Sequence, residues 1–161
     1  MAPLIAGPSE RVTDLAVGVE WDPNGPYVLI TGGYGAVLAL IAYTDDPNQH
    51  CVVLRWKYAI AVALEPPNDE AITGHRLYDR GLSEIVSAGE VLQSAWVADL
   101  ERRNRVHPSH DAERYAGDRH YIFPLKESVA EVVSRHPLEV VRLPGTTLQA
   151  AYAALIPETG S

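Results

Sequence analysis

Residues 66–82, PPNDEAITGHRLYDRGL, hold the densest group of chemically capable side chains in the chain. Asp69 and Glu70 are adjacent carboxylates, and His75 follows five residues after Glu70. A carboxylate beside a histidine is the minimum for general acid–base catalysis, because it orients the imidazole and stabilises the charged form. We therefore predict that His75 is the catalytic acid or base and that Asp69 or Glu70 is its partner.

The same stretch also supplies side chains suited to a polar substrate. Arg76 and Arg80 carry a planar guanidinium that binds a carboxylate or phosphate through two hydrogen bonds. The predicted substrate-binding residues are Asn68, Arg76, Tyr78, Arg80, His107 and His110. The alternative is a structural loop whose side chains satisfy one another, with Arg80 bonded to Asp69 or Glu70, although polar loops on rigid scaffolds often carry sites.

A second group of polar residues comprises His107, His110, Asp111 and His120. Imidazole nitrogens and one carboxylate are ligands for zinc or iron, but this spacing matches no established ligand pattern. His120 shares a strand face with Ile122, which favours a buried, hydrogen-bonded histidine. We predict no metal and no other cofactor, and the sequence leaves open whether these four residues bind a metal.

Two periods of hydrophobicity indicate the elements that position these residues. Alternation over 13–21 and 51–65, with apolar runs at 26–31 and 36–43, predicts antiparallel strands joined by short turns. Strand-like patterns return over 119–143.

Two helices are predicted in the second half of the chain. Ser87 and Glu90 match a capping box, which predicts the main helix over about 88–103. A second amphipathic helix is predicted over about 147–156. The sequence thus predicts one α+β domain over 1–161, β-rich and mainly antiparallel, with flexible ends at 1–10 and 158–161.

Composition narrows the functional classes. The formal net charge of −8 at pH 7 disfavours binding to a phosphate backbone, so we predict no nucleic-acid partner. The single cysteine, Cys51, fits a reducing compartment, and the longest apolar run is far short of a membrane span. We predict a cytoplasmic protein with a small-molecule ligand and no membrane partner, and a homodimer stays open.

Three segments resemble a family of small, uncharacterised bacterial proteins. Their loop carries P-N-D-E-A followed by G-H-x-L-Y-x-x-G-L, as residues 67–82 do, and N-R-V-H-P-x-H matches residues 104–110. The third segment, R-H-aromatic-aliphatic-Phe, matches residues 119–123. The resemblance covers roughly residues 50–125 and implies membership and compartment, without a reaction. Related chains continue with Phe-x-Asp-Ser-x-Phe-Glu, whereas this chain has Glu127 at the aspartate position.

Two functional hypotheses follow from these residues. The first is a small, cofactor-free enzyme that acts on a polar metabolite by general acid–base chemistry, as an isomerase, lyase or hydrolase. The second is a non-catalytic module that binds a ligand or a protein and uses the polar loop structurally. The enzyme requires the His75 imidazole in a concave pocket within reach of a carboxylate.

Overall fold

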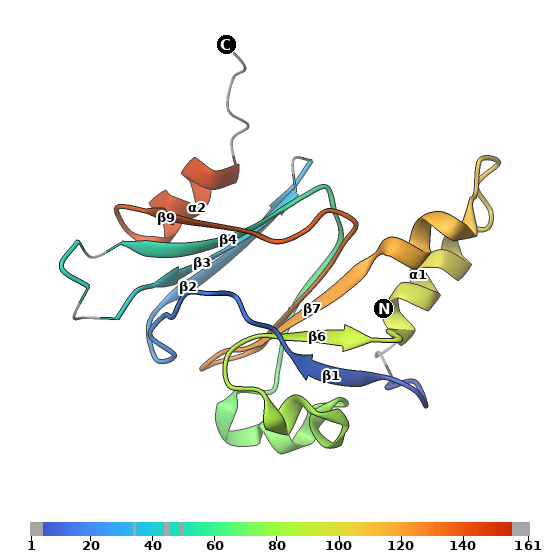
Figure 1. The fold of residues 1–161 in the computed structure, drawn as a ribbon, viewed down its shortest axis with the longest axis horizontal. Helices are drawn as coiled ribbons and strands as arrows, with labels where there is room; N and C mark the ends of the chain where they lie inside the picture. Colours follow the sequence, from blue (N-terminus) through green and yellow to red (C-terminus); the bar gives the residue numbers. More distant parts are fainter. Residues whose placement is uncertain (1–4, 34, 44–45, 49, 156–161) are drawn as a thin grey trace, which may run out of the picture.

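The computed structural model describes residues 5–33, 35–43, 46–48 and 50–155, which form two antiparallel sheets with helical segments against their outer faces (Figure 1). The five-stranded sheet has the order β1-β6-β7-β8-β5, and the four-stranded sheet has the order β2-β3-β4-β9. This arrangement confirms the predicted α+β class. Among the described helices, none is long and apolar enough to cross a membrane.

The strands of the five-stranded sheet are β1 (Arg11–Asp14), β5 (Ala59–Glu65), β6 (Gly89–Leu92), β7 (Arg119–Pro124) and β8 (Val129–Ser134). Those of the four-stranded sheet are β2 (Tyr27–Gly32), β3 (Gly35–Ile41), β4 (Cys51–Lys57) and β9 (Glu139–Leu143). The α-helices are α1 (Ala95–Asn104) and α2 (Thr147–Leu155). Four 3-10 segments complete the described elements: η1 (Asp69–Gly74), η2 (Tyr78–Arg80), η3 (Leu82–Glu84) and η4 (Ala112–Gly117).

The main core lies between the two sheets. Successive side chains of a strand point to opposite faces, so every second residue of β4, β7 and β8 enters this core. Trp56 of β4 packs against Tyr121 and Phe123 of β7, each with a ring-centroid separation of 5.6 Å. These three side chains and their neighbours Leu38 and Val132 are almost fully buried, which makes this the largest hydrophobic contribution to stability.

The outer face of each sheet is covered separately. Small alanines of α2 pack on Val37 and Val53 of the four-stranded sheet. On the five-stranded sheet, Leu77, which precedes η2, and Leu82 of η3 bury Ile122, which projects outward from β7. The other outward residues of β7 and β8 include His120 and Glu131. Because their sequence neighbours point into the inner core, these two polar side chains point outward, toward α1 and η1–η3.

The main helix begins later than predicted. Residues 89–92 form β6, paired with both β1 and β7, because Gly89 and Val91 fit a buried strand between two neighbours. The helix is capped by Ser94, whose Oγ accepts from the Val97 amide at 3.1 Å, and not by a capping box at Ser87 and Glu90. Gln93 turns the chain between strand and helix with a φ of 51°.

Other predicted boundaries also shift. The first strand covers Arg11–Asp14 only. Residues 15–21 do not continue the strand, although Trp21 is buried in the main core. The terminal helix agrees with the predicted start at residue 147, while residues 1–4 and 156–161 lie outside the described residues. Within the predicted flexible start, Glu10 is buried and accepts from the amides of Gly7 and Ala95.

Candidate functional site

The loop of residues 66–82 folds as three short 3-10 segments against the outer face of the five-stranded sheet. Asn68 caps η1 by accepting from the Ala71 amide at 3.2 Å. Leu77 is fully buried between the loop and the sheet. Gly81 has a φ of 104°, and a Cβ there would collide with the Val12 carbonyl oxygen, so this position requires glycine. The loop therefore holds residues 75–77 close to β8.

The loop contacts Glu131, in the middle of β8. Arg76 donates two hydrogen bonds to its carboxylate, from Nη1 to Oε1 at 3.0 Å and from Nη2 to Oε2 at 2.7 Å. His75 Nε2 lies 3.6 Å from Oε1, while His75 Nδ1 accepts from the Leu77 amide at 3.2 Å. The carboxylate is thus bound by a guanidinium in the paired geometry that favours strong recognition.

Glu131 also contacts the neighbouring strand and, through it, helix α1. His120 Nε2 lies 2.8 Å from Glu131 Oε2, and His120 Nδ1 lies 2.8 Å from the Ser94 Oγ. The Trp96 ring packs edge-on against the His120 imidazole, with a centroid separation of 5.3 Å. Ser94, His120 and Glu131 therefore form a continuous hydrogen-bonded chain, which we call the relay, between α1 and β8.

Electrostatics keep the relay carboxylate ionised. Burial alone would raise the pKa of Glu131. The hydrogen bond from His120, the nearby His75 Nε2 at 3.6 Å and the positive charge of Arg76 instead hold this pKa well below the ordinary glutamate value. An ionised carboxylate only accepts hydrogen bonds, so His120 carries its proton on Nε2. In the neutral imidazole Nδ1 is then unprotonated and accepts the Ser94 hydroxyl proton.

Two hollows flank this network. The larger, which we call the α1 hollow, has a volume of about 430 Å³. It is lined by Glu90, Val91, Leu92, Gln93, Ser94, Val97, Ala98, Glu101, Tyr115, Ala116, Asp118 and Arg119. The smaller, the proline hollow, has a volume of about 210 Å³. It is lined by Glu65, Pro66, Pro67, Gly74, His75, Arg76, Val129 and Glu131. The two ends of the hydrogen-bonded network therefore line different hollows.

Of the loop residues predicted to do chemistry, His75 and Arg76 reach the relay. Asp69 is bonded to Lys126 at 2.7 Å and Glu70 is exposed, so the carboxylate beside His75 is Glu131 and neither predicted partner. Arg80 donates to the Pro8 carbonyl oxygen at 2.7 Å, which differs from both roles considered for it. Tyr78 is half-buried on η2, and Asn68 serves as a helix cap.

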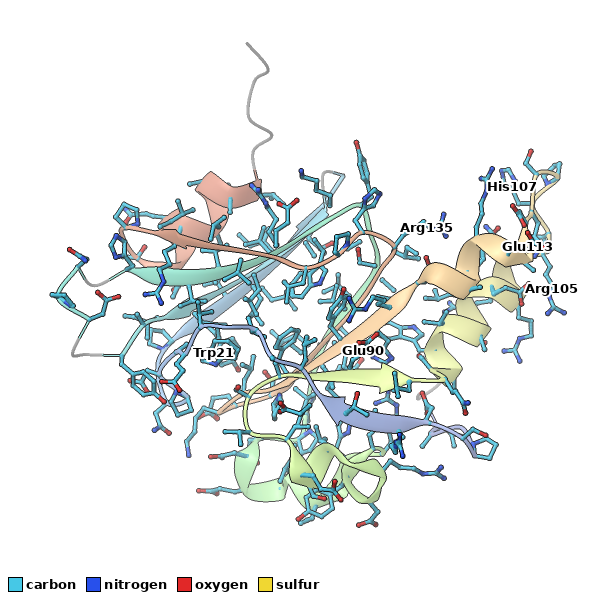
Figure 2. The ribbon with its side chains drawn as sticks, viewed as in Figure 1. Trp21, Glu90, Arg105, His107, Glu113 and Arg135 are labelled. Carbon is cyan, nitrogen blue, oxygen red and sulfur yellow. The ribbon has the colours of Figure 1, made fainter. Side chains whose placement is uncertain are left out.

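The two predicted binding histidines lie in another part of the molecule. His110 Nε2 is 2.8 Å from Glu101 Oε1, and its Nδ1 is 3.2 Å from the Asn104 Oδ1. His107 sits at the far end of the connector after α1, away from the 3-10 segments below the sheet (Figure 2). Among the described residues, no group of three or more histidine, cysteine, aspartate or glutamate side chains could hold a metal ion. His107 and His110 therefore do not face His75.

Two relay residues were absent from the sequence prediction. Glu131 interrupts the apolar run Val129–Val133, and a single carboxylate in such a run is a signal for a paired, buried charge. Ser94 directly precedes the apolar face of α1, where a serine is expected as a cap. Neither signal gives the distance to His120, which depends on the register of β7 and β8.

Comparisons with models of protein families, with curated proteins and with solved structures find no match to this chain.

Proposed function

We propose that this protein is a small, cofactor-free enzyme that hydrolyses an acyl ester of a polar small molecule in the α1 hollow. Ser94 is the nucleophile, His120 is the general base and Glu131 orients the imidazole. The observation that carries this proposal is the chain of two 2.8 Å contacts that joins the Ser94 hydroxyl to His120 and His120 to Glu131. A nucleophile bonded to a base, with the base oriented by a third group, is the arrangement that activates a hydroxyl.

The order of hydrogen-bond donors and acceptors along the relay favours proton removal from Ser94. Because Glu131 fixes the proton of the neutral imidazole on Nε2, the Ser94 hydroxyl proton points at Nδ1. As the proton moves to His120, the imidazole becomes positive and the ionised Glu131 stabilises it across 2.8 Å. The Val97 amide donates to the Ser94 Oγ and favours the negative charge that develops on this oxygen.

The proposed reaction has two halves. The Ser94 oxygen attacks the acyl carbon, its proton passes to His120, and the bond to the leaving alcohol breaks as His120 returns the proton to that alcohol. Water then attacks the acyl carbon, gives its proton to His120, and the bond to Ser94 breaks with return of the proton to the serine oxygen. The products are one carboxylic acid and one alcohol.

Arg119 is suited to stabilise the oxygen that becomes negative. It lines the same hollow as Ser94, and its Nε and Nη2 are bonded to Glu90 at 2.8 and 2.5 Å. Among the described residues Nη1 has no hydrogen-bond partner, so its donor is available to a substrate that reaches the Arg119 side of the hollow; the Arg119 side chain lies over the Tyr121 ring, on the opposite face of β7 from His120. The Ala95 amide, in contrast, is occupied by the Glu10 carboxylate at 2.7 Å. The oxyanion donor in this proposal is therefore a side chain, which acts electrostatically.

His75 and Arg76 act as positioning residues in this proposal. Arg76 binds both oxygens of Glu131, and its side chain is largely buried against β8. The interaction fixes the carboxylate rotamer, so that Oε2 stays aligned with His120 Nε2. Residues 66–82, which were predicted to be catalytic, thus contribute to the proposed reaction through Glu131, at the end of the relay opposite Ser94.

Turnover of p-nitrophenyl acetate by matched serine variants tests the proposal. Ser94→Ala removes the nucleophile, whereas Ser83→Ala removes an exposed hydroxyl on η3 and serves as the control. We expect Ser94→Ala to lower kcat/KM by about a hundredfold or more, and Ser83→Ala to leave it unchanged. Thermal melting of both variants verifies the fold. Equal turnover by folded Ser94→Ala and Ser83→Ala would contradict the proposal and favour the non-catalytic module, in which Ser94 serves only as the cap of α1.

A further inference from the structure

The segment that precedes β1 contacts the start of helix α1, next to Ser94. We propose that residues 5–10, which we call the N-terminal strap, inhibit the proposed hydrolase, because the Glu10 carboxylate occupies an oxyanion position beside Ser94. Opening of the strap then exposes the Ala95 amide as an oxyanion donor and raises turnover. This inference rests on the proposed function, because it concerns the regulation of the same site.

Glu10 is the buried anchor of the strap. It is 3% exposed, whereas Ile5, Pro8 and Ser9 are exposed. One of its carboxylate oxygens accepts from the Ala95 amide at 2.7 Å, and the other accepts from the Gly7 amide at 2.6 Å. Hydrogen bonds from an amide to a carboxylate are stronger than those between neutral groups. The strap is therefore fixed to the start of α1 through this one side chain.

The Ala95 amide is placed as an oxyanion donor would be. In hydrolases whose serine sits at a strand-to-helix turn, the amide of the residue after the nucleophile stabilises the oxyanion. Here Ser94 lies between β6 and α1, and Gln93 makes the sharp turn with a φ of 51°. The Ala95 amide also lies at the positive end of the helix dipole, which favours a negative group. Glu10 therefore takes the donor that the developing oxyanion requires.

A few contacts hold the rest of the strap. Arg80 of η2 donates to the Pro8 carbonyl oxygen at 2.7 Å, and Ala6 packs on the apolar cluster around Leu77. Beside these contacts is a hollow of about 350 Å³, which we call the strap hollow. It is lined by Pro8, Ser9, Glu10, Arg11, Val12, Asp79, Arg80, Gly81 and Glu84. A segment with few buried apolar contacts opens at a low free energy, so the strap can release Ala95 while the sheets stay folded.

Turnover of p-nitrophenyl acetate by strap variants tests the inference, after subtraction of the turnover that remains when Ser94→Ala is added to each variant. Glu10→Ala frees the Ala95 amide, and we expect kcat/KM to rise about tenfold or more, since one oxyanion donor is worth about a hundredfold or more in kcat. Arg80→Ala releases Pro8 and should give a smaller rise. Glu84→Ala removes an exposed carboxylate from the strap hollow and should leave turnover unchanged. Thermal melting verifies the fold of each variant.

Inhibition by acetate provides a second readout. Glu10→Ala leaves the Ala95 amide without its carboxylate, so a small carboxylate ion can bind in the same place. We expect sodium acetate to lower the turnover of Glu10→Ala toward that of the wild type, with sodium chloride as the control for ionic strength. The wild type and Glu84→Ala should show no such inhibition, because Glu10 already occupies the amide.

The outcomes separate this inference from the proposed function. Ser94-dependent turnover that is present in the wild type, but not raised in folded Glu10→Ala, overturns the inference alone and makes Glu10 a structural cap of α1. A rise that acetate does not reverse also overturns it. If Glu10→Ala does not fold, Arg80→Ala decides: a rise supports the inference, and unchanged turnover overturns it. Turnover that is independent of Ser94 in every variant overturns the inference and the proposed function together.

Discussion

Replacement of Glu131 by glutamine should destabilise the fold strongly. The Glu131 side chain is 8% exposed and that of Arg76 is 13% exposed, so the neutral amide leaves a nearly buried guanidinium without its counterion. Removal of one partner from a buried pair costs about 3–5 kcal/mol, because the remaining charge has lost both water and its partner. Domains of this size have a total free energy of unfolding of roughly 5–15 kcal/mol. The single change should therefore remove a large share of it.

The chain offers a matched control for this experiment. Glu139 on β9 accepts from Arg55 at 2.7 Å, the same distance as the closest Arg76–Glu131 contact, but its side chain is 34% exposed. Urea denaturation should show a loss of about 3–5 kcal/mol for Glu131→Gln and of about 1 kcal/mol or less for Glu139→Gln. A loss below about 1 kcal/mol for Glu131→Gln would refute the reasoning, since it would mean that water reaches Arg76 freely.

Two further predictions concern stability. Folding lowers the pKa of Glu131, so its contribution to the free energy of unfolding is complete above the ordinary glutamate pKa of about 4.3 and is lost as the pH falls from there toward the folded value. The urea midpoint of the wild type should therefore decline between pH 7 and pH 3, and the midpoint of Glu131→Gln should decline less. Leu77→Ala should cost about 2–5 kcal/mol, because Leu77 is fully buried beneath the loop. A loss below about 1 kcal/mol would show that the loop is not anchored there.

The sequence predicted the fold class because hydrophobic alternation is a local property. In β4, Val52, Leu54 and Trp56 enter the main core as the alternation indicates. The main helix was predicted to begin too early in the sequence. Ser87 and Glu90 match a local capping signal, but strand pairing with distant segments overrides this signal. Residues 89–92 gain two strand neighbours as β6, and these neighbours lie far away in sequence.

The candidate site was less predictable because it depends on pairing between distant segments. His75 was chosen for its nearness to Asp69 and Glu70 in sequence, but Asp69 lies beside Lys126 in the fold. The carboxylate near His75 belongs to β8, and Glu131 lies 55 residues after Arg76 in sequence. His120 was predicted to be buried and hydrogen-bonded, and the structure has it almost fully buried between Ser94 and Glu131.

The most direct test of the central claim is covalent labelling of Ser94. A fluorophosphonate reacts with an activated serine hydroxyl, with loss of fluoride and formation of a bond from the serine oxygen to phosphorus. Intact-mass and peptide mass spectrometry of the labelled wild-type protein should show a single adduct on Ser94. The same treatment of Ser94→Ala should show none, and that of Ser83→Ala should match the wild type. An unlabelled wild-type protein, or an adduct on another residue, would contradict the claim that the relay activates Ser94.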